Sequence, residues 1–310
     1  MTRVRALFFG SPAFAVPSLR ALAAETELLG VVSQPDRPAG RGQTATPPAV
    51  KVAAQALGAR VIQPEKLRTP EALAELGAFG ADLFVVVAYG RILPQAILDL
   101  ARLGAYNVHA SLLPRLRGAA PIQWPIIRGD SETGVSIMRM EAGLDTGPVA
   151  AMRALPIRDD DTAGTLSDRL ATLGAGLLAE TLPAIVEGRV ALIPQDHAAA
   201  TLAPMLTKAD GRVAFDRPAR LVSAHARGVD PWPGASALLE GEPLKLFAPR
   251  VVDGGGGRPG EVLGLRPQGL AVACAEGAVA FTELQLPGRR RMPAAAVLAG
   301  RRIPAGTVLA

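Results

Sequence analysis

Three residues between positions 107 and 145 carry the side chains best suited to catalysis. Asn107 and His109 are separated by a single residue, and Asp145 lies in a Gly-Leu-Asp-Thr-Gly segment. An Asn amide can donate to a developing oxyanion, a neutral His can take or give a proton, and an Asp can fix the His tautomer and stabilise its cation. Together these groups suit the attack of an amine on a carbonyl carbon, which is acyl transfer.

A strand over residues 104–109 would place Asn107 and His109 on one face, because side chains alternate along a strand. Both would lie at its carboxyl end, where open α/β sheets bind ligands. An isolated Asn-x-His pattern is also compatible with polar side chains that are simply satisfied at a strand end. The chain has 3 histidines, and neither His197 nor His225 lies in a comparable cluster, which favours the catalytic interpretation.

Apolar runs alternate with amphipathic or alanine-rich segments in the first part of the chain. Near-continuous Val and Leu runs are typical of strands covered on both faces, and the rhythm predicts an α/β fold with a doubly wound, mostly parallel sheet. Extended segments at 133–140 and 148–157 precede a helix over 163–187, capped by Asp161 or Thr162. The first strands are predicted at 5–9, 28–33, 60–63, 82–88 and 104–109.

The pattern weakens after residue 189, which predicts a catalytic domain at 1–189, a linker at 190–207 and a second domain at 208–310. The second domain begins with a short helix near 218–227. Brief strands separated by turn residues then predict a small barrel. These strands are expected at 235–239, 244–250, 260–265, 270–274 and 278–286.

The net charge of +5 lies wholly in the last third of the chain. Residues 1–207 carry 19 Lys plus Arg and 19 Asp plus Glu, whereas 208–310 carry 14 and 9. A basic domain beside a neutral catalytic one is expected if a polyanion must be held, although a solvated basic surface has the same composition.

Length, composition and short motifs exclude several classes of protein. A chain of 310 residues is long enough for two domains. It has no run of about 18 uncharged apolar residues and no signal-peptide pattern, so we expect a cytoplasmic protein without a membrane span. Cys274 is the single cysteine, which excludes an intramolecular disulfide and predicts a core position. No Gly-x-Gly-x-x-Gly or Walker sequence provides a phosphate cradle.

The catalytic segment and several others resemble the 10-formyltetrahydrofolate-dependent formyltransferases. The resemblance is carried by Asn-Val-His-Ala-Ser-Leu-Leu-Pro-Arg-Leu-Arg-Gly-Ala-Ala-Pro-Ile at 107–122 and Gly-Leu-Asp-Thr-Gly-Pro at 143–148. It extends to residues 10–17, 34–42, 85–94 and 231–234. The resemblance implies a Rossmann-like sheet, a C-terminal OB-like barrel, and formyl transfer from 10-formyltetrahydrofolate as co-substrate, without a metal.

The resemblance also implies roles for individual residues. Asn107, His109 and Asp145 would be catalytic. The residues expected to contact the folate are Ser111, Leu112, Leu113 and Pro114. Because this proline restricts a tight turn, the bond before it is expected to be cis.

A long loop is predicted at 34–48. Its 34–42 part and the Pro-Trp-Pro segment favour the tRNA-directed members of this family. Their resemblance implies that the amine belongs to methionyl initiator tRNA, that the enzyme is a monomer, and that Arg41 and Lys208 contact the tRNA. A surface loop whose arginines contact no tRNA would have the same sequence pattern.

Two other functions remain compatible with the sequence. The same centre could formylate a small amine, such as glycinamide ribonucleotide or an amino sugar nucleotide, although such an enzyme needs no basic second domain of this type. The chain could instead be an RNA-binding or folate-sensing protein with an inactive site. The intact set of Asn107, His109 and Asp145 argues against this last function.

Overall fold

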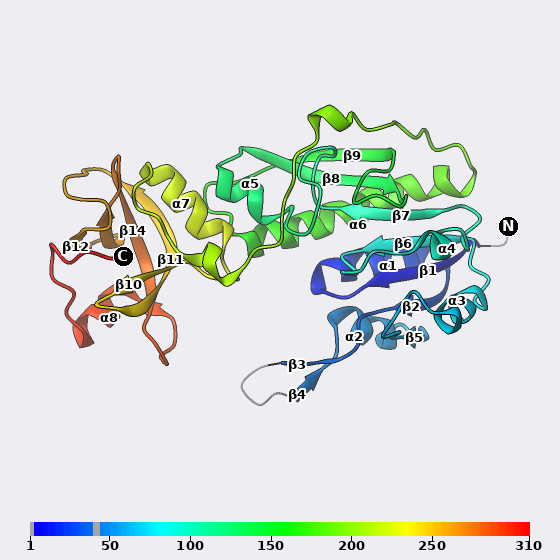
Figure 1. Cartoon of the computed structure of the whole chain (residues 1–310), viewed down its shortest axis with the longest axis horizontal. Coiled ribbons are helices and arrows are strands. Elements are labelled where there is room, and N and C mark those ends of the chain that lie inside the picture. The colour runs from blue at the N-terminus through cyan, green and yellow to red at the C-terminus, as the bar shows by residue number, and fades with distance from the viewer. Residues whose placement is uncertain (1–2, 40–43) are drawn as a thin grey trace. The chain divides into compact units, whose positions relative to one another are not determined.

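The computed structural model describes residues 3–39 and 44–310 (Figure 1). The chain forms two compact units. The first consists of Met1–Pro121, Thr133–Leu155 and Ser167–Pro204, and the second of Ile122–Glu132, Pro156–Leu166 and Met205–Ala310.

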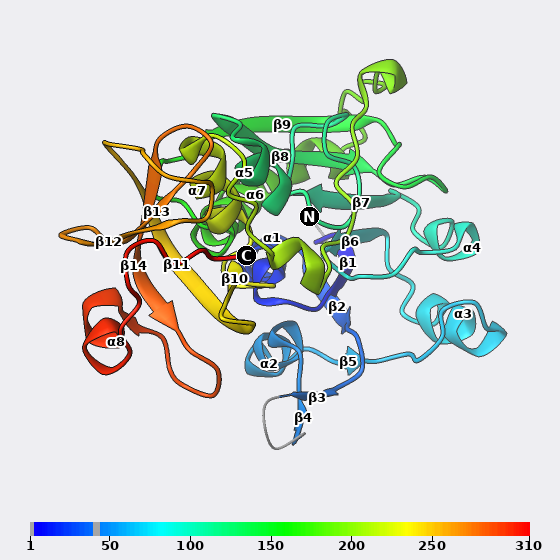
Figure 2. The same cartoon turned by 60° about the vertical axis from the view of Figure 1, so that its left-hand side comes forward.

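A seven-stranded sheet forms the centre of the first unit in the described part of the chain. Its strands are β1 (Arg5–Gly10), β2 (Glu27–Val32), β5 (Val61–Ile62), β6 (Leu83–Val87), β7 (Ala105–His109), β8 (Glu132–Arg139) and β9 (Val149–Pro156). Figures 1 and 2 show them in the order β5-β2-β1-β6-β7-β8-β9. The pairs from β5 to β7 are parallel, and β8 runs antiparallel to β7. The predicted mostly parallel sheet is confirmed.

Helices follow the strands as the βαβ rhythm predicts. They are η1 (Ala13–Ala15), α1 (Val16–Glu25), α2 (Ala49–Ala56), α3 (Pro70–Gly77), α4 (Gln95–Leu98), α6 (Ala163–Val186) and η2 (His197–Ala199). Leu7 and Phe9, which alternate along β1, share one core with Leu76 of α3 and Ile97 of α4. Burial of apolar side chains between sheet and helices therefore holds the strand ends in place.

The long helix α6 packs against the sheet. A Cβ at Gly174 would lie 2.8 Å from Val108 of β7 and 3.5 Å from Val135 of β8, so the helix backbone approaches both strands closely. Among the described helices, α6 alone is long and apolar enough to cross a membrane by length and composition. Its packing accounts for that composition. Of the two predicted caps, Thr162 accepts from the Thr165 N–H at 3.2 Å.

The second unit contains a curled antiparallel sheet, as predicted for an OB-like barrel. Its strands are β10 (Ser236–Leu239), β11 (Glu242–Val252), β12 (Val262–Arg266), β13 (Gly269–Ala273), β14 (Ala278–Gln285) and β15 (Met292–Pro293). The order is β10-β11-β14-β13-β12, with β15 beside β14. The helices are α5 (Gln123–Arg128), η3 (Lys208–Gly211), α7 (Ala219–Gly228) and α8 (Ala294–Gly300).

Some short elements differ from the sequence-based expectation. The 34–48 segment, predicted as a loop, contains the antiparallel pair β3 (Arg37–Ala39) and β4 (Thr44–Thr46). Helices α5 and α8 were not predicted either. All of them are too short to show a clear periodicity, and proline or glycine interrupts several of them.

Candidate active site

Strand β7 brings Asn107 and His109 to the carboxyl edge of the parallel sheet. Gln34, just beyond β2, ties neighbouring strand ends together there: its backbone N–H donates to Ser11 Oγ at 3.1 Å and its Nε2 donates to the Tyr89 carbonyl at 3.1 Å. A hollow of about 370 Å³ is lined by residues 65–69 with Arg91 and Ile92, which follow β5 and β6, and neither Asn107 nor His109 is among its lining residues. The site thus lies where open α/β sheets bind ligands.

Asn107 lies on the same face of β7 as His109 and is partly exposed. Among the residues that the structure describes, its carboxamide makes no hydrogen bond. The amide is therefore free to donate to a ligand atom at this edge.

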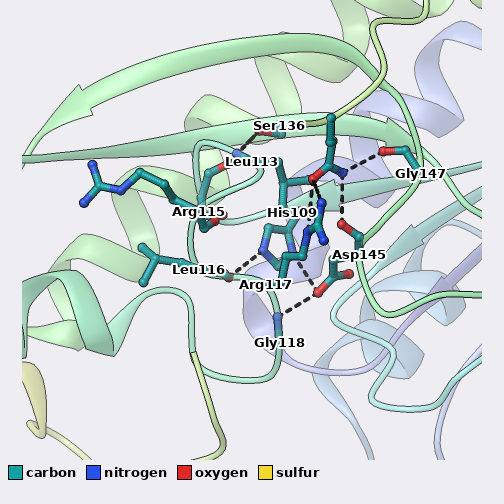
Figure 3. Close-up of polar contacts among 11 residues, drawn as sticks. His109, Leu113, Arg115, Leu116, Arg117, Gly118, Ser136, Asp145 and Gly147 are labelled. Atoms are coloured by element: carbon teal, nitrogen blue, oxygen red, sulfur yellow. Dashed lines mark hydrogen bonds and ion pairs between the residues drawn. The ribbon is translucent and has the colours of Figure 1, made fainter. Parts of the chain in front are cut away.

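The imidazole of His109 is buried and fixed by one backbone contact (Figure 3). Its Nε2 lies 3.1 Å from the Leu116 carbonyl oxygen. Because a carbonyl can only accept, Nε2 carries the hydrogen. Nδ1 then faces the Asp145 carboxylate at 3.7 Å, so it is the nitrogen left to exchange a proton.

Asp145 lies in the loop between β8 and β9, with its backbone in the left-handed region at φ 52°. Its Oδ2 accepts from the Gly118 N–H at 2.8 Å. Two residues later, a Cβ at Gly147 would collide with the Arg139 carbonyl oxygen, so only glycine lets the loop return this close to β8. The structure therefore brings His109 and Asp145 together across 36 positions of sequence.

The predicted folate-binding residues form a loop that is held by hydrogen bonds to the nearby backbone and to Ser136 of β8. Ser111 Oγ donates to the Arg115 carbonyl at 2.6 Å. Ser136 Oγ, on β8, donates to the Ser111 carbonyl at 2.7 Å and accepts from the Leu113 N–H at 3.1 Å. The Leu113–Pro114 bond is cis, as expected.

Within that loop, Ser111 and Leu113 are buried, whereas Leu112 and Pro114 are partly exposed. Leu112 packs over Gly134 of β8, where a Cβ would collide with its side chain. Contact of these residues with folate stays a prediction.

Two buried polar residues that the sequence did not reveal also belong to this site. Arg117 is 7% exposed and Gln195 is 8% exposed. The guanidinium donates to Gln195 Oε1 from Nε at 3.1 Å and from Nη2 at 2.6 Å. Gln195 falls in the Pro-, Ala- and polar-rich stretch that the sequence assigned to the linker, and no local pattern marks it as buried.

The structure describes one of the two residues predicted to contact tRNA. Arg41 lies outside the described residues. Lys208 is exposed at the start of η3 in the second unit, where Thr207 and Asp210 form a capping box. In residues 3–39 and 44–310, no cluster of three or more His, Cys, Asp and Glu side chains is arranged to hold a metal ion.

Comparison with known proteins identifies the family of this fold and site. The family model described as formyl transferase matches residues 3–182. The chain belongs to that family. A second model, described as the formyl transferase C-terminal domain, matches residues 205–302.

Full-length relatives carry a more specific name. A methionyl-tRNA formyltransferase of Sorangium cellulosum is 50% identical over 309 residues, which are 99% of each chain. One of Geobacter sulfurreducens is 47% identical over 310 residues, covering 100% of this chain and 98% of its own. The formyl transferase described here therefore aligns with these enzymes through both of its units.

Solved structures share the fold at lower identity. HypX from Aquifex aeolicus in complex with tetrahydrofolic acid superimposes with a TM-score of 0.65 at 20% identity over 96% of this chain, which spans 47% of HypX. The sugar 3N-formyl transferase WlaRD superimposes with a TM-score of 0.68 at 14% identity, over 94% of this chain and 100% of WlaRD. At these identities the likeness concerns the fold alone.

Proposed function

We propose that this formyl transferase moves the formyl group of 10-formyltetrahydrofolate to the α-amino group of methionine esterified to initiator tRNA. The match to methionyl-tRNA formyltransferases over 99% of the chain supports the choice of substrate. The observation that carries the chemistry is the buried His109 imidazole, whose Nδ1 faces the Asp145 carboxylate at 3.7 Å.

The first step is attack of the neutral amine on the formyl carbon. A C–N bond forms, and the carbonyl oxygen takes up negative charge in a tetrahedral intermediate. The Asn107 carboxamide donates to this oxyanion. The proton that the attacking amine loses passes to His109 Nδ1, and the protonated ring then helps to stabilise the negative charge. The partly exposed position of Asn107 and its lack of a partner among the described residues support this assignment.

The second step breaks the bond between the formyl carbon and N10 of the folate. The attacking nitrogen must lose a proton, and N10 must gain one before it leaves. His109 Nδ1 and the Asp145 carboxylate move this proton directly or through water. The Nε2 contact with Leu116 keeps the ring in the orientation that this transfer needs.

The loop from Ser111 to Pro114 would contact the folate beside the catalytic pair, and the basic second unit would hold the tRNA. Arg41 and Lys208 are the residues we assign to tRNA contact. Lys208 is exposed, which a phosphate contact requires.

The test presents the purified chain with 10-formyltetrahydrofolate and three amines in turn: charged initiator tRNA, glycinamide ribonucleotide and an amino sugar nucleotide. We expect formylated methionyl-tRNA and negligible product from the small amines. Product from a small amine alone would assign the chain to that reaction, and no product from any amine would favour a binding protein.

We also propose that the chain acts as a monomer in the cytoplasm, where charged initiator tRNA enters translation. Light scattering should give a mass near 32.0 kDa. A mass twice as large would contradict the monomer, and recovery in a membrane fraction would contradict the location.

A further inference from the structure

The carboxamide of Gln195 holds the loop that carries Asp145. Its Nε2 donates to the Asp145 carbonyl oxygen at 2.9 Å and to the Gly147 carbonyl oxygen at 2.7 Å. Both hydrogens of one amide nitrogen are thus used on a single turn of the chain. Residues 141–144, just before this turn, are exposed. The amide therefore anchors a loop whose leading half is exposed to solvent.

A short backbone bridge places Gln195 beside this loop. Ile193 and Val149 exchange two backbone hydrogen bonds, at 2.8 and 2.9 Å, in an isolated antiparallel bridge. That bridge ends two residues before Gln195 and begins two residues after Gly147. The side chain thus enters the loop from a paired segment rather than from a free one.

Arg117 determines which way the amide points. Its Nε and Nη2 both donate to Gln195 Oε1, and a guanidinium has no acceptor. Oε1 must therefore face Arg117, which leaves Nε2 facing the two carbonyls. Because both side chains are more than nine-tenths buried, a turned amide would leave donors and acceptors without partners.

The short segment 116–118 connects this amide to the catalytic pair. Leu116 accepts from the imidazole, Arg117 holds the amide, and the Gly118 N–H donates to Asp145 Oδ2 at 2.8 Å (Figure 3). Three successive residues thus each hold one part of the site. A displacement of the amide would therefore act on Asp145 in two ways: directly at its carbonyl, and through Arg117 and Gly118 at its carboxylate.

We propose that Gln195 is a positioning residue for formyl transfer: by holding the Asp145 and Gly147 carbonyls, it sets where the Asp145 carboxylate stands relative to His109 Nδ1. This role rests on the proposed function, since it matters only if Asp145 takes part in proton transfer. Gln195 acts through Asp145 and takes no proton itself.

Two substitutions at Gln195 test the hydrogen bonds that its amide makes. Gln195→Met keeps the length of the side chain and removes every polar contact. Gln195→Glu keeps an oxygen for Arg117 but sets a second oxygen against the two carbonyls. We expect both to lower kcat for charged initiator tRNA on the order of 10- to 100-fold, with little change in KM for either substrate, because a small displacement of a reacting group is costly.

The matched control is His197→Ala. His197 Nδ1 is the other partner of Arg117 Nη2, at 3.2 Å, and the residue is exposed. Removing it leaves the amide on the loop, so kcat should stay that of the unaltered chain.

A double-mutant cycle with Asp145→Asn distinguishes positioning from a general structural role. In the Asp145→Asn chain the carboxylate is already absent, so changing Gln195 should cost no further activity. Loss by the same factor in both backgrounds would overturn the proposal, as would an unchanged kcat in the native background. Thermal unfolding checks that each variant is folded. If Gln195→Met does not fold, the kcat of Gln195→Glu tests the proposal.

Activity of the unaltered chain distinguishes failure of the proposed function from failure of the positioning role. If it transfers no formyl group to charged initiator tRNA, the proposed function fails. If it does so and kcat is indifferent to Gln195, only the positioning role fails.

Discussion

The Nε2 of His109 donates to the carbonyl oxygen of Leu116 at 3.1 Å. This bond determines which ring nitrogen is reactive, because the occupied Nε2 leaves only Nδ1 to exchange a proton. Asp145 lies on that side of the ring, at 3.7 Å. The ring is thus oriented by the backbone, and the carboxylate is left to interact with the proton that moves.

Replacement of the imidazole is the first test of this arrangement. His109→Ala should lower kcat for formyl transfer about 100-fold or more, the usual contribution of a general acid or base. Steady-state assays with saturating charged initiator tRNA measure it, with exposed His197→Ala as the control. Near-normal turnover would remove His109 from the mechanism.

The charge of Asp145 can be removed without removing its hydrogen bond to Gly118. Asp145→Asn keeps an oxygen that accepts from the Gly118 N–H, so the melting temperature should change by no more than a few degrees. The rate should nevertheless fall about 100-fold or more, since the group that faces Nδ1 can no longer hold or accept a proton. Unchanged rates in a folded variant would exclude Asp145 from the proton path.

Lys208 tests the tRNA assignment. Lys208→Ala should weaken tRNA binding and make its salt dependence shallower by about one unit of log K against log salt, the change expected for one phosphate contact. Arg102→Ala is the control, because Arg102 precedes β7 and so lies at the opposite end of that strand from His109. Equal salt slopes for Lys208→Ala and the unaltered chain would contradict the contact.

Cys274 should be unreactive in the folded protein. The residue is 5% exposed, and burial raises the pKa of its thiol to about 11. At pH 8 only about one molecule in a thousand would carry a thiolate, the form that reacts. A maleimide or iodoacetamide should therefore label the chain slowly until denaturant is added, and rapid labelling of folded protein would refute the buried position.

His225 should make the second unit less stable in weak acid. Burial lowers the pKa of this imidazole below its ordinary value of 6.5, against the opposing effect of the bond from its Nε2 to the Asp210 carbonyl at 2.7 Å. Between 6.5 and the lower folded pKa, the unfolded chain binds a proton that the folded chain does not. The free energy of unfolding should therefore decrease as pH falls from about 7 towards 5.

The measurement is denaturant unfolding at several pH values. His225→Gln keeps a donor for the Asp210 carbonyl and cannot titrate, so the decrease should be smaller in this variant. Asp230 acts in the opposite sense, because burial raises the pKa of its carboxyl from 3.8. It is present in both chains, so the difference between them reports His225 alone. Identical pH profiles would refute the prediction.

The sequence predicted the strands of the first unit to within one or two residues. A central strand such as β6 (Leu83–Val87) consists entirely of buried side chains, so its apolar run is visible without any tertiary information. The Asn107 and His109 pair could be predicted for a similar reason, since strand alternation is a local property. Arg37–Ala39 and Thr44–Thr46 were missed because such short pairs have no periodicity to detect.

Local pattern thus determined the alternation of strands and helices, the side of β7 on which Asn107 and His109 lie, and the types of group available for chemistry. Only the tertiary structure decided that the imidazole is held by Leu116, that Nδ1 faces Asp145, and that a buried Gln195 restrains the loop. These contacts join residues up to 50 positions apart. They depend on how sheet, loops and chain segments pack together, because a hydrogen bond between distant residues leaves no periodic trace in the sequence.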